Sequence, residues 1–189
     1  MSPGRVGPPT CTDEVLRHAQ DGQAWAVRAV YDDFAPRIAG YLRARGVIDP
    51  DDLTSEVFLG VLPRLASVTG GAAGLRLLLF SVAHARLVDS IRDRARRPTP
   101  LSYDAATDPR TAPSAEDDAE HLLGTERAVA MLAQLPASQR EVLSLRILGD
   151  LTVEQVAGVL GTTEGAVKQH QRRGLLALRA LVVEGAVTL

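Results

Sequence analysis

Hydrophobic side chains recur at helical spacing in the stretch DPDDLTSEVFLGVLPRLA, which begins at Asp49. Residues four positions apart lie on one side of an α-helix, and here four such positions are apolar: Leu53, Val57, Val61 and Leu65. Asp49 is a favourable N-cap and Pro50 suits the first helical position, so we expect the helix to begin there. Pro63 is expected to kink it.

Similar patterns predict a helical region from about Thr12 to Arg45. Breaks are expected near Gly22 and Pro36, and Gly46 suits the end of the region. The Pro- and Gly-rich residues 1–11 are predicted to be a disordered tail.

Further helices are predicted at about 75–97, stopped by Pro98, then at 115–134, and then up to Gly149. The stretch TGGAAG, residues 69–74, is predicted to be a loop, and residues rich in Pro, Thr, Ser, Ala and Asp after Pro98 indicate a linker. No stretch has the alternation of a strand. The chain is therefore predicted to be all-α.

Composition agrees with this fold class. Of the 189 residues, 46% are hydrophobic but only 4% are aromatic, so the core must consist mostly of Ala, Val and Leu, which favours helices over sheets. The single cysteine, Cys11, excludes an internal disulfide and supplies no metal cluster. The start of the chain lacks the apolar core of a signal peptide, so a cytoplasmic location without membrane insertion is expected.

Charge is distributed unevenly along the chain. The net charge is −2, yet residues 86–97 hold five Arg against two Asp, and residues 161–179 hold four cations against one acid. Between them, residues 101–126 hold seven acids and one Arg. Two basic patches are therefore separated by an acidic stretch, and the total hides them.

The second basic patch lies within a helix-turn-helix pattern. After Gly149, Thr152 and Gln155 form a capping box, and a short apolar helix follows that ends at Gly161. Thr162 or Thr163 then caps a second helix. Its predicted apolar stripe consists of Val167, Gly174, Leu175, Leu178, Leu181 and Val182, and its other side carries Lys168, Gln169, Arg172, Arg173 and Arg179.

Such a helix can enter the major groove of DNA. Thr163, Lys168 and Gln169 lie near its start, where side chains reach base edges, whereas the arginines further along meet phosphates. The alternative is an amphipathic helix whose charges only keep it soluble. Because caps, turn and face agree with one another, we favour DNA binding.

The stretch LPASQREVLSLRILGDLTVEQVAGVLGTTEGAVKQHQRRGLLALR resembles the promoter-binding region 4 of sigma factors, and in particular of the extracytoplasmic-function (ECF) group of the sigma-70 family. In the N-terminal half, DPDDLTSEVFLGVLPRL is similar to the region 2 helix that grips core RNA polymerase, and LLFSVAHARLVDSIRDRARR to the helix that opens and reads the −10 element. The resemblance implies two small helical domains joined by a flexible acidic linker. Their expected bounds are 12–97 for region 2, 98–121 for the linker and 122–189 for region 4, after a tail of 1–11.

The resemblance also implies roles for particular residues. Those expected to bind core polymerase are Asp51, Asp52, Leu53, Glu56, Val57 and Phe58, although burial in the core is the alternative for Leu53 and Val57. Those expected to face the −10 DNA are Arg86, Asp89, Arg92, Arg94, Arg96 and Arg97. Those expected to meet the −35 element are Thr163, Lys168, Gln169, Arg172 and Arg173.

The partners implied are core RNA polymerase, double-stranded promoter DNA, the melted −10 strand and an anti-sigma factor, which often holds such proteins. No cofactor, no metal and no catalysis by the chain itself are expected, because no nucleophile, general base or phosphate loop stands out and the histidines fit no metal-site spacing.

Some positions depart from the family pattern. Leu78 stands where a Trp is common, and His84 and Ala85 stand where the family tends to have Arg and Asn. The Gly-rich loop lies where such factors hold a flipped base, yet it offers neither a cationic groove nor stacking surfaces. A weak or unusual −10 preference is expected.

Two other functions were weighed. A LuxR-like helix-turn-helix regulator would act without polymerase, but the N-terminal half lacks the alternating strands and helices of a receiver domain. A helical interaction protein that does not bind DNA would show no salt-dependent promoter binding.

Overall fold

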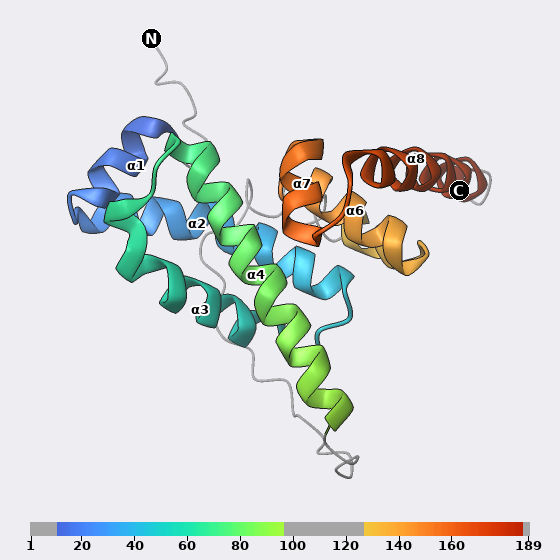
Figure 1. Ribbon diagram of the computed structural model, residues 1–189, viewed down its shortest axis with the longest axis horizontal. Helices are drawn as coiled ribbons and strands as arrows, with labels where there is room; N and C mark the ends of the chain where they lie inside the picture. The colour runs from blue at the N-terminus through green and yellow to red at the C-terminus, as the bar shows by residue number, and fades with distance from the viewer. Residues whose placement is uncertain (1–10, 97–126, 187–189) are drawn as a thin grey trace.

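The computed structural model describes residues 11–96 and 127–186, and within these ranges every regular element is helical. The fold is all-α, as expected from the sequence (Figure 1). The predicted linker, residues 98–121, lies outside the described residues. The elements are α1 (Asp13–Gln20), α2 (Ala24–Ala44), α3 (Pro50–Val61), the 3₁₀-helix η1 (Leu62–Ser67), α4 (Gly71–Arg96), α6 (Ala137–Ile147), α7 (Val153–Leu160) and α8 (Glu164–Ala186).

The N-terminal half packs α1, α2, α3 and η1 around α4, which crosses the molecule diagonally in Figure 1. Its core has few aromatic side chains, as the composition predicted. The largest buried side chains include Phe34, Tyr41, Leu75, Leu79 and Phe80.

The break predicted near Gly22 is present, but Pro36 lies inside α2 and does not end it. Proline removes the N–H that would bond to the carbonyl four residues earlier, here that of Asp32. Both Pro36 and Asp32 are exposed, so water can satisfy that carbonyl.

Cys11, predicted to belong to the tail, is instead buried at 6% exposure. Its backbone N–H donates to Asp33 Oδ2 at 2.9 Å, which ties the chain to α2 just before α1 begins. Burial beside Asp33 raises the pKa of the Cys11 thiol to about 11, so at neutral pH it is a protonated core side chain.

The capped start of α3 is confirmed. The Asp49 carboxylate accepts from the Asp52 N–H at 3.0 Å, and Pro50 is the first helical residue. The predicted apolar face of Leu53, Val57, Val61 and Leu65 is buried. At Pro63 the chain does more than kink, because α3 gives way to η1 one residue earlier.

The predicted loop over 69–74 is shorter than expected, since α4 already begins at Gly71. The Asp13 carboxylate accepts from the Ala72 N–H at 2.7 Å and so caps this helix from α1. A side chain at Gly71 would collide with that carboxylate, and φ is +64° there. The sequence pattern did not predict this cap, because Asp13 lies 59 residues before Ala72 in the chain.

By length and composition alone, the segment Gly71–Arg94 of α4 could span a membrane, with a mean hydropathy of 1.3. The core helix of a globular domain passes the same test. Leu75, Leu79 and Leu87 of this segment are fully buried within the helical core.

The C-terminal half begins, in the described part, with a helical segment at 127–133, followed by α6, α7 and α8. Both α6 and α7 pack against α8. The two halves also touch each other, because α6 contacts α2 and α7 contacts α4. In Figure 1 this places α6 and α7 beside the C-terminal end of α2.

Candidate nucleic-acid interface

The predicted helix-turn-helix is present as α7 and α8, and its termini are capped as the sequence indicated. The Gln155 N–H donates to Thr152 Oγ1 at 3.2 Å and the Thr152 N–H donates to Gln155 Oε1 at 2.8 Å, which completes the capping box. Gly161 ends α7 in the left-handed region, with φ of 61°. Of the two threonines proposed as the next cap, Thr163 is used, since its Oγ1 accepts from the Ala166 N–H at 3.2 Å.

The first part of α8 is held tightly against α6. Val167 is fully buried. A Cβ at Gly174 would lie 2.6 Å from Leu143 Cδ1, so glycine allows the two helices to approach. From the α6 side, Arg146 Nε donates to Gln171 Oε1 at 3.1 Å. These contacts fix which face of α8 points outward.

The predicted apolar stripe of α8 is wrong in its C-terminal part. Leu175 is 47% exposed and Val182 is 52% exposed, whereas Leu178 and Leu181 are half-buried. Val182 is exposed because α7 has 8 residues and α6 has 11, so neither reaches the end of the 23-residue α8. Leu175 lies between buried Gly174 and half-buried Leu178, at the edge of the covered face, where it lines the surface groove described below.

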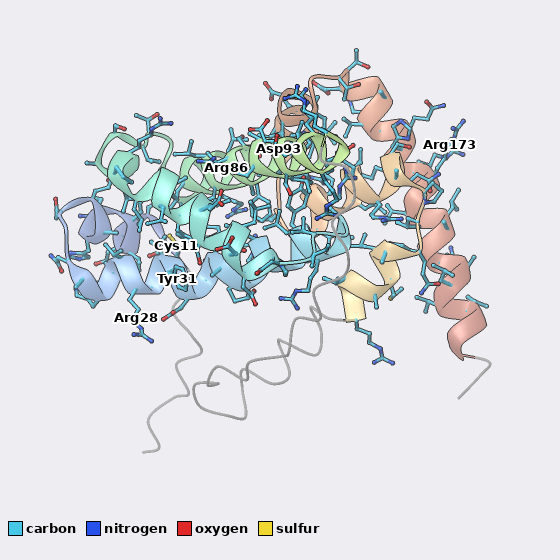
Figure 2. All side chains as sticks on the ribbon, turned by 90° about the horizontal axis from the view of Figure 1, so that it is seen from below. Cys11, Arg28, Tyr31, Arg86, Asp93 and Arg173 are labelled. Atoms are coloured by element: carbon cyan, nitrogen blue, oxygen red, sulfur yellow. The ribbon has the colours of Figure 1, made fainter. Side chains whose placement is uncertain are left out.

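The outer face of α8 is cationic. Lys168, Gln169, Arg172, Arg173 and Arg179 are all exposed. Figure 2 shows Arg173 on the outer side of this helix. Lys168 Nζ pairs with Glu164 Oε2 at 3.0 Å, one turn earlier. Beside these residues a shallow groove of about 430 Å³ is lined by Val153, Lys168, Gln171, Arg172, Leu175, Leu176 and Arg179.

The second predicted DNA-facing set lies on α4. Arg86, Asp89, Arg92, Arg94 and Arg96 are exposed, and Arg97 lies outside the described residues. Asp89 Oδ1 lies 3.7 Å from Arg92 NH1. Arg86 NH1 lies 3.9 Å from Glu56 Oε2 of α3, so this face adjoins the predicted polymerase-binding helix. Figure 2 shows Arg86 and Asp93 along the same helix.

The predicted polymerase-binding set on α3 divides into two groups. Asp51, Asp52 and Glu56 are exposed. Leu53, Val57 and Phe58 are buried at 9%, 0% and 3% exposure, so they support the helix from inside and are not available for a partner. Their helical spacing was compatible with either role, and only the packing of α2 and α4 against α3 distinguishes the two.

Sequence reasoning missed two apolar side chains on this surface. Leu59 of α3 is 73% exposed, and Ile48, just before the helix, is 81% exposed. Leu59 lies one turn after Glu56 and so extends its exposed face. The hydrophobic pattern alone could not separate this leucine from the core.

His84 takes part in a contact that the sequence did not predict. Tyr41 Oη lies 3.0 Å from His84 Nδ1, and His84 Nδ1 lies 3.9 Å from Glu141 Oε1 of α6. Burial is the main cause that lowers the pKa of His84. The charge of Arg45 lowers this pKa further, whereas the charge of Glu141 raises it. Burial likewise raises the pKa of Tyr41. At neutral pH this hydrogen bond therefore joins a protonated phenol to a neutral imidazole.

No group of three metal-binding side chains occurs within 11–96 and 127–186.

The chain is similar to known proteins over most of its length. Residues 131–180 match the family model described as sigma-70, region 4. The chain is 30% identical over 181 residues to "ECF RNA polymerase sigma factor SigD" of Mycobacterium tuberculosis, covering 90% of this chain and 84% of that protein. It is 30% identical over 182 residues to "ECF RNA polymerase sigma factor ShbA" of Streptomyces griseus, covering 91% and 95% respectively.

With "ECF RNA polymerase sigma factor BldN" of Streptomyces coelicolor the identity is 28% over 175 residues, and the chain spans 66% of that protein's length. Among solved structures, CnrH in complex with the cytosolic domain of CnrY is similar with a TM-score of 0.56 and 21% identity, covering 92% of this chain and 98% of that one. That likeness supports the fold.

Proposed function

The chain belongs to the ECF family of RNA polymerase sigma factors, and we propose that it brings core RNA polymerase to promoters by placing α8 in the −35 major groove and α4 against the −10 segment. The observation that carries this proposal is the capped helix-turn-helix with an outward cationic face, within the part of the chain that matches region 4. The relatives do not favour a LuxR-like regulator that acts without polymerase.

At the −35 element, the start of α8 reads sequence and its middle holds the backbone. Lys168 and Gln169 lie within the first two turns and reach base edges, where lysine favours guanine and glutamine favours adenine. Thr163 caps the helix and presents its hydroxyl to the DNA at the same end. Arg172 and Arg173, one turn further on, meet phosphates.

At the −10 element, the C-terminal end of α4 supplies positive charge along the melted strand. The set proposed to face this strand is Arg86, Asp89, Arg92, Arg94 and Arg96, followed in the sequence by Arg97, and its arginines carry the positive charge. The two carboxylates Asp89 and Asp93 lie among these arginines, which lowers the net attraction for phosphates. This supports a weaker hold on the −10 strand than on the −35 duplex.

Core polymerase contacts the exposed face of α3. Asp51, Asp52 and Glu56 provide charge, and Leu59 provides apolar area. The residues buried behind them hold this face in place. We further propose that the protein acts in the cytoplasm, that it performs no catalysis itself, and that region 2 (12–97) and region 4 (122–189) are its functional domains.

Run-off transcription tests this function. Purified chain would be added to bacterial core RNA polymerase with a pool of promoter fragments, and the enriched fragments sequenced. We expect transcripts from a restricted set of templates that share a −35 motif. Transcription without template preference, or no gain over core polymerase alone, would refute the proposal.

Within this assay, Glu56→Lys tests the polymerase surface and Glu14→Lys is the matched control, since both residues are exposed acids on helices of the N-terminal half. Glu56→Lys should reduce binding to core polymerase and all transcripts together. Glu14→Lys should leave both unchanged.

A further inference from the structure

One acidic side chain lies at the start of the otherwise cationic face of α8. Residues 161–179 hold four cations, and Glu164 is the single acid among them. Glu164 is the first residue of α8, and it is exposed. The phosphates of a duplex repel a carboxylate, so Glu164 opposes the general attraction that the arginines of α8 provide. Holding the DNA backbone is therefore not its role.

Helix stability accounts for little of the presence of Glu164. Thr163 already caps α8, since its Oγ1 accepts from the Ala166 N–H at 3.2 Å. The ion pair of Glu164 with Lys168 is open to solvent, because the Lys168 side chain is 64% exposed and that of Glu164 is 51% exposed. Water and salt screen a pair this exposed, so it contributes only weakly to folding.

Glu164, Lys168 and Arg172 follow one another along a single ridge of α8. Residues four positions apart on an α-helix are separated by about 6 Å along the axis and by about 40° around it. In helix-turn-helix proteins the N-terminal residues of the second helix contact base edges. Glu164 precedes Lys168 on this ridge, so it lies at the end of α8 that meets the bases.

The ion pair also restrains Lys168. Its Nζ donates to Glu164 Oε2 at 3.0 Å. An ammonium group has three N–H donors, so two remain for another partner. A lysine side chain is flexible and loses rotamer freedom when it binds, and a contact already made within the helix reduces that loss. Lys168 is thus held on the ridge with donors left for O6 and N7 of a guanine.

The chemistry of the carboxylate selects one base. In the major groove cytosine presents the N4 amino donor, whereas guanine and thymine present the acceptors O6, N7 and O4. A carboxylate only accepts hydrogen bonds, so it bonds to cytosine and is repelled by guanine and thymine. Adenine places its N7 acceptor beside its N6 donor, which disfavours the second carboxylate oxygen. Cytosine is therefore the base that suits Glu164.

We propose that Glu164 is a specificity-determining residue of the −35 interface, which accepts a hydrogen bond from the N4 amino group of a cytosine and orients Lys168 towards the guanine of a neighbouring base pair. The inference rests on the proposed function and names bases that this site selects. Because Glu164 repels phosphates and acceptor-bearing bases, it also weakens binding to other sequences, and such repulsion is one of the two ways to build specificity.

The test uses the full chain bound to core RNA polymerase and a duplex promoter library with a randomised −35 segment. The fragments that the wild type retains should share a cytosine and a guanine on neighbouring base pairs. In Glu164→Gln the preference for cytosine should fall by about fivefold or more and shift towards adenine, because an amide bonds to both N6 and N7 of adenine.

Two further variants define the effect. Glu164→Ala should lose the preference for cytosine without gaining another, and it should bind an unrelated duplex more tightly than the wild type, since one repulsive charge is gone. Glu14→Gln is the matched control, because Glu14 is an exposed glutamate in the first turn of α1. It should leave the base preference unchanged. Circular dichroism establishes that each variant folds.

Lys168→Ala separates direct reading by Glu164 from its action on Lys168. In the Lys168→Ala background the preference for guanine is already lost, and Glu164→Gln should still shift the neighbouring position from cytosine towards adenine. A shift that disappears together with Lys168 would overturn the contact of Glu164 with cytosine.

An unchanged ranking of bases in folded Glu164→Gln would also overturn the proposal, as would a wild-type motif that lacks this cytosine. Failure of the proposed function looks different, because the wild type with core polymerase would then show no template preference at all. A wild type that selects a motif which the Glu164 variants read equally well refutes only the role of Glu164.

Discussion

The two DNA-facing helices differ in how firmly their basic residues are held. In α8, Lys168, Arg172 and Arg173 lie between Val167 and Gly174, the two buried positions that anchor the helix. Among the side chains of α4 whose burial the structure describes, the last buried one is Leu87, and Arg92, Arg94 and Arg96 all follow it. One set is therefore preorganised by packing, and the other lies on a helix end that extends into solvent.

The difference has an energetic meaning. A preorganised side chain loses little conformational freedom on binding, whereas residues on an unsupported helix end must be ordered by the ligand. This is consistent with α8 reading a rigid duplex and α4 following a single strand, whose shape adapts. The contrast between α8 and the end of α4 can be tested by substitutions at these positions.

The largest effect is expected from a substitution at Val167, one of the two buried positions that hold α8 in place. Val167→Asp places a charge at a fully buried position and should lower the free energy of unfolding by about 3 kcal/mol or more. Ile91→Asp, on the unsupported end of α4 where Ile91 is 49% exposed, should change it by less than ~0.5 kcal/mol. Urea denaturation followed by circular dichroism measures both, and equal losses would contradict the contrast.

Sequence readout should be confined to the start of α8. Gln169→Ala should relax base preference at one −35 position by about 1–3 kcal/mol, and Lys168→Ala should do so at a neighbouring position. Binding to a randomised −35 library measures this. If Gln169→Ala binds every sequence with the same ranking as the wild type, then Gln169 does not read bases.

Phosphate contacts should appear in the salt dependence on both helices. Arg173→Ala should weaken duplex binding about equally for all sequences and reduce the slope of log K against log salt by about 0.9. Arg92→Ala should reduce the slope on a single-stranded −10 oligonucleotide by about 0.7. Titrations at several salt concentrations give both slopes. An unchanged slope in either case would remove that arginine from its interface.

The smallest effect is expected from pH and concerns His84, which lies in the buried part of α4, before Leu87. Burial lowers the pKa of His84 in the folded chain, whereas in the unfolded chain it should return to about 6.5. The unfolded chain therefore binds the extra proton more readily, so the contribution of His84 to the free energy of unfolding is largest above pH ~6.5 and is lost as pH falls below it. Tyr41, Glu141 and Arg45 all adjoin this imidazole, and their variants should modify the effect.

The free energy of unfolding, measured by urea denaturation, should thus decrease from pH 7.5 to pH 5.5 in the wild type. His84→Phe, which keeps an aromatic ring but cannot titrate, should reduce that decrease. A decrease of equal size in His84→Phe would assign the pH dependence to another group.

Much of the local structure was predictable from the sequence. Helix positions, the Asp49 cap, the Thr152–Gln155 capping box and the turn at Gly161 depend on residues within about four positions of one another, so they are readable in a linear pattern. The same holds for the cationic face of α8, since its spacing alone places it opposite Val167.

What only the tertiary structure decided is which apolar residues are covered. Leu53 and Leu59 are six residues apart on one helix, yet one is buried and the other is exposed, because burial depends on which neighbouring helix covers each side. The same reason explains the Asp13 cap on α4 and the contact of Arg45 with Glu141, which join residues 59 and 96 positions apart. Contacts of that range are set by how the helices pack, and no local pattern records them.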